Sequence, residues 1–119
     1  MKKFYKSLLV ASAGIRQFFL KNRNAGIQLT IAVITIILDL VVSISTIQWL
    51  IVLLCIALVL SLEMINTAIE KLCDLITVEV HPEIKFIKDV AAGAVLIASV
   101  FAMVTGLVIF IPALLRFLN

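Results

Sequence analysis

Residues 50–74, "LIVLLCIALVLSLEMINTAIEKLCD", change character halfway along the segment. Residues 50–60 are hydrophobic throughout, whereas residues 63–74 carry three acids and an amide. At 1.5 Å per residue, a helix over residues 47–76 would measure roughly 45 Å, which exceeds a hydrocarbon core of about 30 Å. The second half of this helix is therefore expected to emerge from lipid into water or the headgroup region.

The polar residues of this segment share one face of the predicted helix. At 100° per residue they fall within about 80° of one another around the helix axis. We call this face the polar stripe; it consists of Glu63, Asn66, Glu70 and Asp74. Carboxylates one turn apart repel each other and are costly near lipid. The stripe is tolerable where it faces a partner helix, a divalent cation or water.

The composition around this segment is typical of a membrane protein. Of the 119 residues, 64% are hydrophobic, whereas soluble domains rarely exceed about half. Residues 26–44 and 86–115 form two further apolar spans, and residues 77–85 form a polar turn in which Pro82 is expected to stop any helix. The predicted fold is an all-α, single integral-membrane domain over 1–119 with membrane helices at 26–44, 47–76 and 86–115. So short a chain favours oligomerisation.

The N-terminal region 1–23 has the pattern of an amphipathic helix. Apolar residues recur at helical spacing, and six basic residues supply the polar side. This pattern suits a helix lying along an anionic membrane face. An ordinary amphipathic helix packed on its own bundle would give the same pattern, and the two interpretations are compatible.

The basic residues also predict an orientation. Six lie in 1–23, three surround the second turn at Lys71, Lys85 and Lys88, and Arg116 lies at the far end. The link at 43–48 has none. The positive-inside rule then places the N-terminus and the 71–88 region in the cytoplasm, with the first link and the C-terminus outside.

Two further residues, Lys88 and Asp89, stand where the last helix begins. Helix N-termini and lysines attract phosphate, and carboxylate oxygens hold Mg²⁺. Together with the polar stripe, these groups could transfer phosphate from a nucleotide to a lipid alcohol, because that chemistry depends on positioning and charge neutralisation. Glu63 is the deepest acid and the natural base. The residues alone leave two alternatives open: the proton site of a small multidrug-type antiporter, or an assembly seam without chemistry.

Other classes of site find little support in the sequence. No Walker-type loop, CxxC or HExxH motif is present. Cys55 and Cys73 would be about 27 Å apart on one helix, so they cannot form a disulfide within the chain.

The chain resembles the prokaryotic diacylglycerol kinase family, which includes undecaprenol kinases. The similarity rests on "ALVLSLEMINTAIEKLCDLI" at 57–76, followed after a short turn by "HPEIKFIKDVAAGAVLIAS" at 81–99. It extends to chain length, the N-terminal surface helix and the order of the three spans. The resemblance implies a homotrimeric, multi-pass lipid kinase of the bacterial cytoplasmic membrane that uses MgATP, with no nucleic-acid partner, in phospholipid or lipid-carrier metabolism.

The resemblance also implies roles for individual residues. Glu63 matches the catalytic base, and Glu70 matches a metal-binding glutamate. The expected nucleotide-binding residues are Asn66, Glu70, Asp74, Glu79, His81, Lys88, Asp89 and Lys3.

The sequence departs from the family pattern at one metal position. Where the family has a second metal-binding glutamate, this chain reads "NRNAGIQL" and places Asn22 there. An asparagine carbonyl can ligate Mg²⁺, but without a charge, so a catalytically impaired family member is a further alternative. The apolar residues leave the acceptor open between diacylglycerol and undecaprenol.

Overall fold

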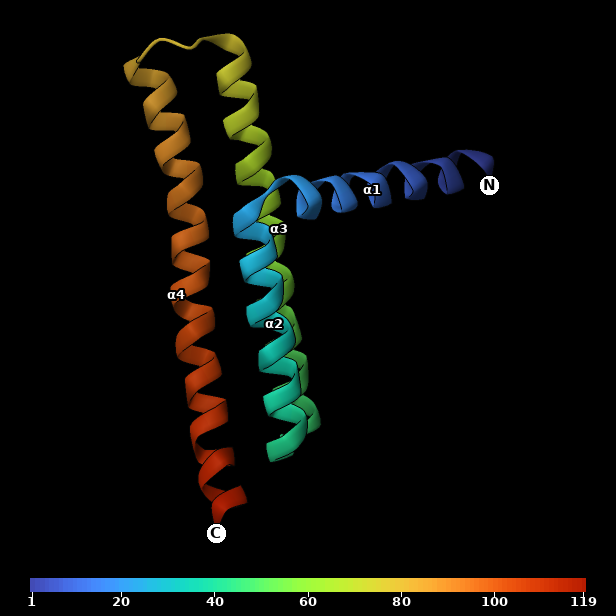
Figure 1. Cartoon of the computed structure of the whole chain (residues 1–119), viewed down its shortest axis with the longest axis vertical. Coiled ribbons are helices and arrows are strands. Elements are labelled where there is room, and N and C mark those ends of the chain that lie inside the picture. The colour runs from blue at the N-terminus through green and yellow to red at the C-terminus, as the bar shows by residue number, and fades with distance from the viewer. The chain divides into compact units, whose positions relative to one another are not determined.

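The computed structural model describes residues 1–119, and the chain folds into four α-helices without any β-strand (Figure 1). The helices are α1 (Lys2–Lys21), α2 (Arg23–Val42), α3 (Thr46–Ile76) and α4 (Pro82–Leu118). By length and composition, α2, α3 and α4 are each able to cross a membrane. The predicted fold class, an N-terminal helix followed by three membrane-length helices, is confirmed. By its internal contacts the chain divides within α2 into two compact units, Met1–Ile34 and Thr35–Asn119.

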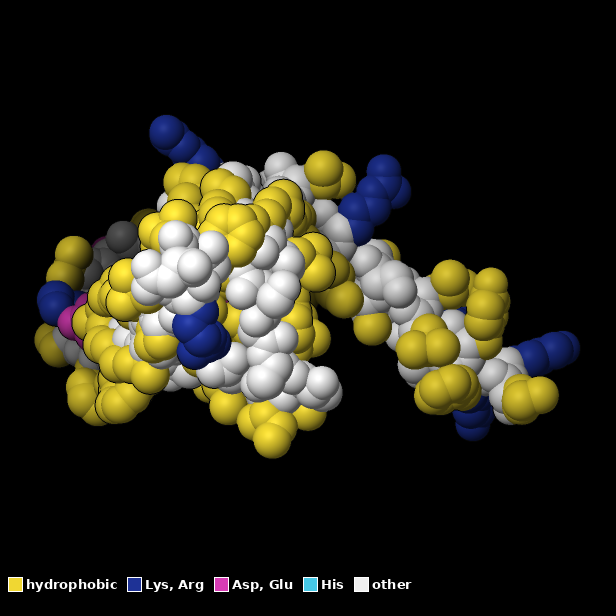
Figure 2. Space-filling view, turned by 90° about the horizontal axis from the view of Figure 1, so that it is seen from below, with side chains coloured by type: hydrophobic (Ala, Val, Ile, Leu, Met, Phe, Trp, Pro, Cys, Tyr) yellow, Lys and Arg dark blue, Asp and Glu magenta, His cyan; other side chains and the backbone are white.

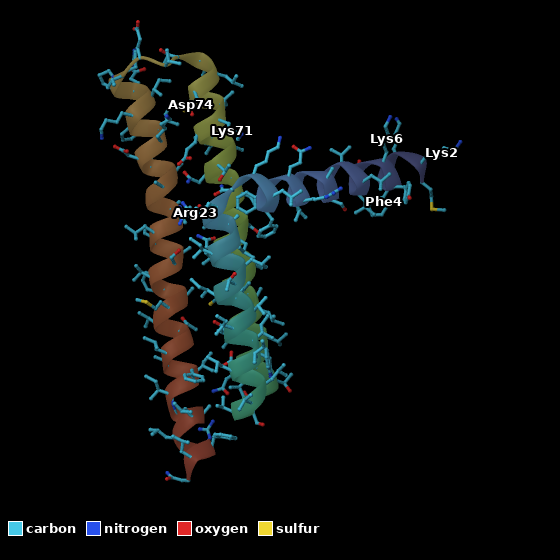
Figure 3. All side chains as sticks on the ribbon, viewed as in Figure 1. Lys2, Phe4, Lys6, Arg23, Lys71 and Asp74 are labelled. Carbon is cyan, nitrogen blue, oxygen red and sulfur yellow. The ribbon has the colours of Figure 1, made fainter.

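In the first unit, α1 is an amphipathic helix with little packing of its own. All residues from 2 to 17 are exposed, and Phe18 is the buried residue of α1. The rings of Phe18 and Phe19 meet edge to face, with centroids 5.1 Å apart. Phe4 and Lys6 project from opposite sides of the helix (Figure 3). This separation of apolar and basic side chains is what the sequence predicted for residues 1–23.

A single residue, Asn22, separates α1 from α2. Its backbone is extended, with φ −119° and ψ 111°, so α1 ends here. The Asn22 backbone N–H donates to the carbonyl of Phe18, and its side-chain Oδ1 accepts a hydrogen bond from the backbone N–H of Asn24 at 3.1 Å. The second contact is typical of an N-cap residue. Asn22 is therefore both the C-cap residue of α1 and the N-cap residue of α2.

In the second unit, α3 and α4 run antiparallel and pack side by side along their length (Figure 1). Buried apolar side chains at the end farther from the α3–α4 turn form one cluster: Val42, Ile44, Val52, Ile109 and Ala113. Trp49 and Phe110 pack against it. Asp39, also in this unit, is only 2% exposed, and its Oδ2 has no hydrogen-bond partner.

The link between α2 and α3 is shorter than the predicted 43–48. Ser43 ends α2 with a positive φ of 58°, and Ser45 already caps α3. The Ser45 hydroxyl accepts from the backbone N–H of Gln48, whose side chain accepts from the backbone N–H of Ser45. This reciprocal capping box fixes the start of α3 at Thr46.

The predicted role of Pro82 is wrong. A polar turn over 77–85 in which Pro82 would stop any helix was predicted, but the turn occupies 77–81 and α4 begins at Pro82 itself. Proline is favourable at the first helical position because the N–H that it lacks would have no partner there. The His81 side chain caps this start by accepting from the backbone N–H of Glu83.

Large apolar side chains are exposed and a few polar ones are buried, which is the distribution expected of a membrane protein. Hydrophobic side chains project from the surface (Figure 2), and residues as large as Leu54 and Phe101 are more than two-thirds exposed. Conversely, the buried polar or charged residues are Asp39, Glu63 and Asn66. Exposed apolar surface of this extent is typical of a protein that contacts lipid, which agrees with the three membrane-length helices.

Candidate active site

The polar stripe of α3 is buried at one end and exposed at the other. Glu63 and Asn66 are 8% and 7% exposed, whereas Glu70 and Asp74 are exposed. The opposite face of α3 is apolar and open, with Leu72 58% exposed. The stripe is buried at its end nearer the apolar half of α3 and becomes exposed towards the turn. This arrangement avoids placing bare carboxylates in lipid.

Asn66 and Glu70 are in direct contact one helical turn apart. Asn66 Nδ2 donates a hydrogen bond to Glu70 Oε1 at 3.2 Å. The amide oxygen, Asn66 Oδ1, is buried and has no hydrogen-bond partner. A buried acceptor without a partner costs about 1–3 kcal/mol, so this oxygen is available to a ligand at low desolvation cost. A carboxylate and an amide oxygen are both ligand types suited to Mg²⁺.

Asp74 and Lys88 connect α3 to α4 across the turn. Lys88 Nζ lies 2.6 Å from Asp74 Oδ1 and donates a hydrogen bond to it. Asp74 is near the end of α3 that leads into the turn (Figure 3). The side chains retain 37% exposure at Lys88 and 64% at Asp74. The pair brings Lys88, the lysine expected to contact phosphate, to the end of the polar stripe that is nearer the α3–α4 turn.

A second ion pair, which the sequence analysis missed, lies next to the first. Lys85 Nζ donates to Asp89 Oδ2 at 2.5 Å, one turn apart on α4. The i, i+4 spacing is itself a sequence signal. It was hidden because residue 85 was assigned to the turn rather than to the helix that starts at Pro82.

The turn between α3 and α4 carries an open cavity of about 250 Å³. Its walls combine apolar and polar side chains: Ile76, Thr77, Glu79, Val80, His81, Glu83, Ile84 and Ile87. The Thr77 hydroxyl accepts from the backbone N–H of Glu79, which stabilises the turn. Two of the expected nucleotide residues, Glu79 and His81, therefore line one cavity.

The remaining expected site residues, Lys3 and Asn22, belong to the first unit, Met1–Ile34, whereas the polar stripe belongs to the second. The chain also gathers no three His, Cys, Asp or Glu side chains into a metal site. The residues that the structure brings together are thus Asn66 with Glu70, and Asp74 with Lys88.

Comparison with known proteins identifies the class of this site. Residues 9–110 match the family model described as prokaryotic diacylglycerol kinase. The undecaprenol kinase of Bacillus subtilis (strain 168) is 40% identical over 114 residues, which cover 96% of this chain and 93% of that protein. The diacylglycerol kinase of Synechocystis sp. (strain ATCC 27184 / PCC 6803 / Kazusa) is 34% identical over 110 residues, or 92% of this chain and 63% of that protein.

No solved structure matches the chain. The family match covers both halves of the site, since residues 9–110 include the polar stripe, the turn and the start of α4. The predicted enzyme class, a lipid kinase, is confirmed by the family and by the names of both relatives. With its three membrane-length helices and a match to the family model over residues 9–110, this chain belongs to the prokaryotic diacylglycerol kinase family.

Proposed function

We propose that this protein transfers the γ-phosphate of MgATP to the hydroxyl of a membrane lipid at the cytoplasmic face of a bacterial cytoplasmic membrane. The observation that carries this proposal is the Asp74–Lys88 contact, which joins the polar stripe of α3 to the start of α4. It gathers acids, an amide and a cation at one end of two membrane-length helices. The family match favours this activity over the antiporter that the residue pattern left open.

The nucleotide would bind over the α3–α4 turn. Lys88 offers an ammonium group to the phosphates, and Asp89 lies beside it on the first turns of α4. The adjacent cavity is lined by apolar side chains that could pack against a base and also by Glu79 and His81. This arrangement uses the attraction of a lysine ammonium for phosphate. Because α4 begins at Pro82, Lys88 and Asp89 lie within the helix rather than at its first residues as the sequence had predicted.

A magnesium ion fits the donor set of the stripe. Glu70 supplies a carboxylate, and the buried Oδ1 of Asn66 is an oxygen donor without a partner. Mg²⁺ at kinase sites is held by one or two carboxylates together with substrate phosphates, and Glu70 would supply such a carboxylate. When bound, the ion would neutralise charge on the transferring phosphate. Asn22 is proposed as a further, neutral ligand.

Glu63 is proposed as the general base. Its carboxylate would accept the proton of the lipid hydroxyl while that oxygen forms a bond to the γ-phosphorus and the bond to the leaving ADP oxygen breaks. Its burial suits the task, because a base at 8% exposure is shielded from competing water. At about 1.5 Å per residue, Glu63 lies about 21 Å from Trp49 along the axis of α3. A base at that depth would meet a hydroxyl whose tail remains in lipid.

The membrane arrangement follows from charge. The basic residues of 1–23 and of 71–88 favour a cytoplasmic N-terminus and turn, with the 43–45 link and the C-terminus outside. In this arrangement α1 would lie on the anionic cytoplasmic surface with its Phe4 side towards lipid and its Lys6 side towards headgroups and water. Lys3, near the start of α1, would reach towards the nucleotide.

Assembly into a homotrimer forms part of the proposal. A single chain leaves large apolar faces on α3 and α4 exposed, and all of its first 17 residues are exposed. Lipid can cover such faces, but a trimer would also enclose the stripe and bring α1 of one chain to the site.

Undecaprenol is the acceptor that we propose. The Bacillus subtilis undecaprenol kinase matches nearly end to end at 40% identity, whereas the chain spans only 63% of the Synechocystis diacylglycerol kinase at 34% identity.

The test is a detergent assay in which purified protein, MgATP labelled at the γ-position and either lipid are incubated together. We expect labelled undecaprenyl phosphate to form at least about ten times faster than labelled phosphatidic acid, a difference of about 1.4 kcal/mol in transition-state binding. Faster phosphorylation of diacylglycerol would reverse the assignment of the acceptor. Proton-coupled efflux from reconstituted vesicles, with no ATP turnover, would exclude a kinase.

A charged residue at position 22 is expected to strengthen metal binding. The number of charged ligands tunes the affinity of oxygen-ligand cation sites, so Asn22→Glu should lower the half-saturating Mg²⁺ concentration by about three- to tenfold. The measurement is a Mg²⁺ titration of lipid phosphorylation. Because Asn22 Oδ1 also caps α2, Asn22→Asp serves as the matched variant that adds charge and preserves the cap. An unchanged titration in both variants would remove position 22 from the metal site.

A further inference from the structure

The ammonium group of Lys88 is held by a carboxylate from the opposite helix. Its Nζ lies 2.6 Å from Asp74 Oδ1, and Asp74 comes from the opposite helix, 14 residues earlier in the chain. The neighbouring pair of Lys85 and Asp89 lies within α4. Asp74–Lys88 is therefore the contact that ties the lysine to α3.

We propose that Asp74 is a positioning residue that occupies Lys88 in the absence of nucleotide and gives it up to the nucleotide phosphate. The inference rests on the proposed function and assigns Asp74 a role opposite to that of a nucleotide ligand. Carboxylate and phosphate oxygens are the same kind of charged acceptor for a lysine ammonium. Asp74 thus stands where a phosphate oxygen would stand.

The exposure of the pair makes such an exchange favourable. Asp74 is 64% exposed and Lys88 37% exposed, and exposed ion pairs contribute little to stability. A nucleotide brings several phosphate oxygens and more than one negative charge, so it outcompetes one solvated carboxylate. The lysine ammonium has three N–H donors on a flexible side chain.

Electrostatics also argues against Asp74 as a direct phosphate contact. A carboxylate beside the phosphates would repel them, whereas Glu70 and Asn66 are farther along the stripe, where a cation can intervene. While it is paired, Asp74 keeps Lys88 near the stripe instead of extended into water. Asp74 therefore competes with the nucleotide phosphate for the ammonium of Lys88, and this competition appears in the affinity for nucleotide.

The test is the steady-state kinetics of Asp74→Asn in the full chain with MgATP as the varied substrate. Removing the competing charge should lower the KM for MgATP about two- to fivefold, the range set by the strength of exposed ion pairs, with kcat changed less than about twofold. Asp74→Glu keeps a carboxylate within reach of Lys88 and should restore the wild-type KM. A fluorescent ATP analogue provides the same comparison as a direct binding affinity.

A double-mutant cycle separates a specific effect from a general charge effect. In a Lys88→Gln background there is no ammonium to compete for, so Asp74→Asn should leave analogue affinity unchanged within about 1.5-fold. Tighter binding in that background as large as in the wild-type background would overturn the proposal, because it would show only the removal of a negative charge near an anion.

A rise in the KM or in the dissociation constant on Asp74→Asn would also overturn it and would make Asp74 a nucleotide ligand. The proposed function fails by a different result, namely that the wild-type chain binds the analogue but phosphorylates neither lipid. The analogue measurement still tests Asp74 in that case.

Discussion

Glu63→Gln is expected to reduce lipid phosphorylation by about 10²–10⁴-fold, the range for removal of a positioned general base. Glutamine has nearly the same shape but cannot accept the hydroxyl proton. Because Glu63 is 8% exposed, water cannot readily replace its carboxylate. The loss should appear in kcat, with little change in the KM for MgATP, since the nucleotide would bind towards the turn. Initial rates with saturating acceptor and variable MgATP measure both constants.

Asp39→Asn is the matched control for this experiment. Asp39 is also a buried acid, at 2% exposure, but lies near the far end of α2 from Asn22. The same change from acid to amide at Asp39 should leave the rate within about threefold, as expected for a residue outside the reaction. Full activity of Glu63→Gln would remove Glu63 as the base, and an equal loss in both variants would indicate that burial of the acid, rather than catalysis, is being measured.

Glu70→Gln is expected to lower the rate by about 10²–10³-fold at millimolar Mg²⁺, the effect of losing one electrostatic stabiliser of the transition state. The amide keeps an oxygen donor, so raising the Mg²⁺ concentration should recover part of the rate. The hydrogen bond from Asn66 Nδ2 to Glu70 Oε1 can still form to an amide oxygen, which preserves the local structure. The measurement is a Mg²⁺ titration at saturating ATP.

The recovery at high Mg²⁺ distinguishes a metal ligand from other roles for Glu70. If the rate fell equally at all Mg²⁺ concentrations, Glu70 would act on the nucleotide or acceptor directly. Asp39→Asn should show the wild-type titration curve, because that acid lies outside the stripe.

The overall architecture was predictable because a membrane limits the structures available. Only helices satisfy their backbone groups within a single span, so apolar stretches such as 26–44 had to be helical. The position of Glu63 on one face with Asn66 followed from helical periodicity alone, and their burial agrees with it. The same periodicity placed Glu70 on that face, where it contacts Asn66.

The start of the last helix could not be inferred by treating proline only as a helix breaker. Pro82 is compatible with the first helical position, and the His81 side chain provides the cap that makes this start favourable. The four-residue error at this boundary also hid the i, i+4 pair of Lys85 and Asp89.

The contact between Asp74 and Lys88 depended on information that periodicity does not contain. Whether two residues 14 positions apart meet depends on the length and conformation of the turn, here 77–81. Asn22 illustrates a different limit. Its side chain caps α2, which a comparison with a glutamate at the same position does not reveal.

The continuity of α3 links the enzyme to the physical state of its bilayer. This helix runs from Thr46 to Ile76 without glycine or proline, so it carries its lipid-embedded half and its carboxylates on one rigid rod. A helix longer than the local hydrocarbon layer responds by tilting. Any tilt of this rod would change the height of Glu63 relative to the lipid headgroups, so with Glu63 as the proposed base we expect turnover to vary with membrane thickness.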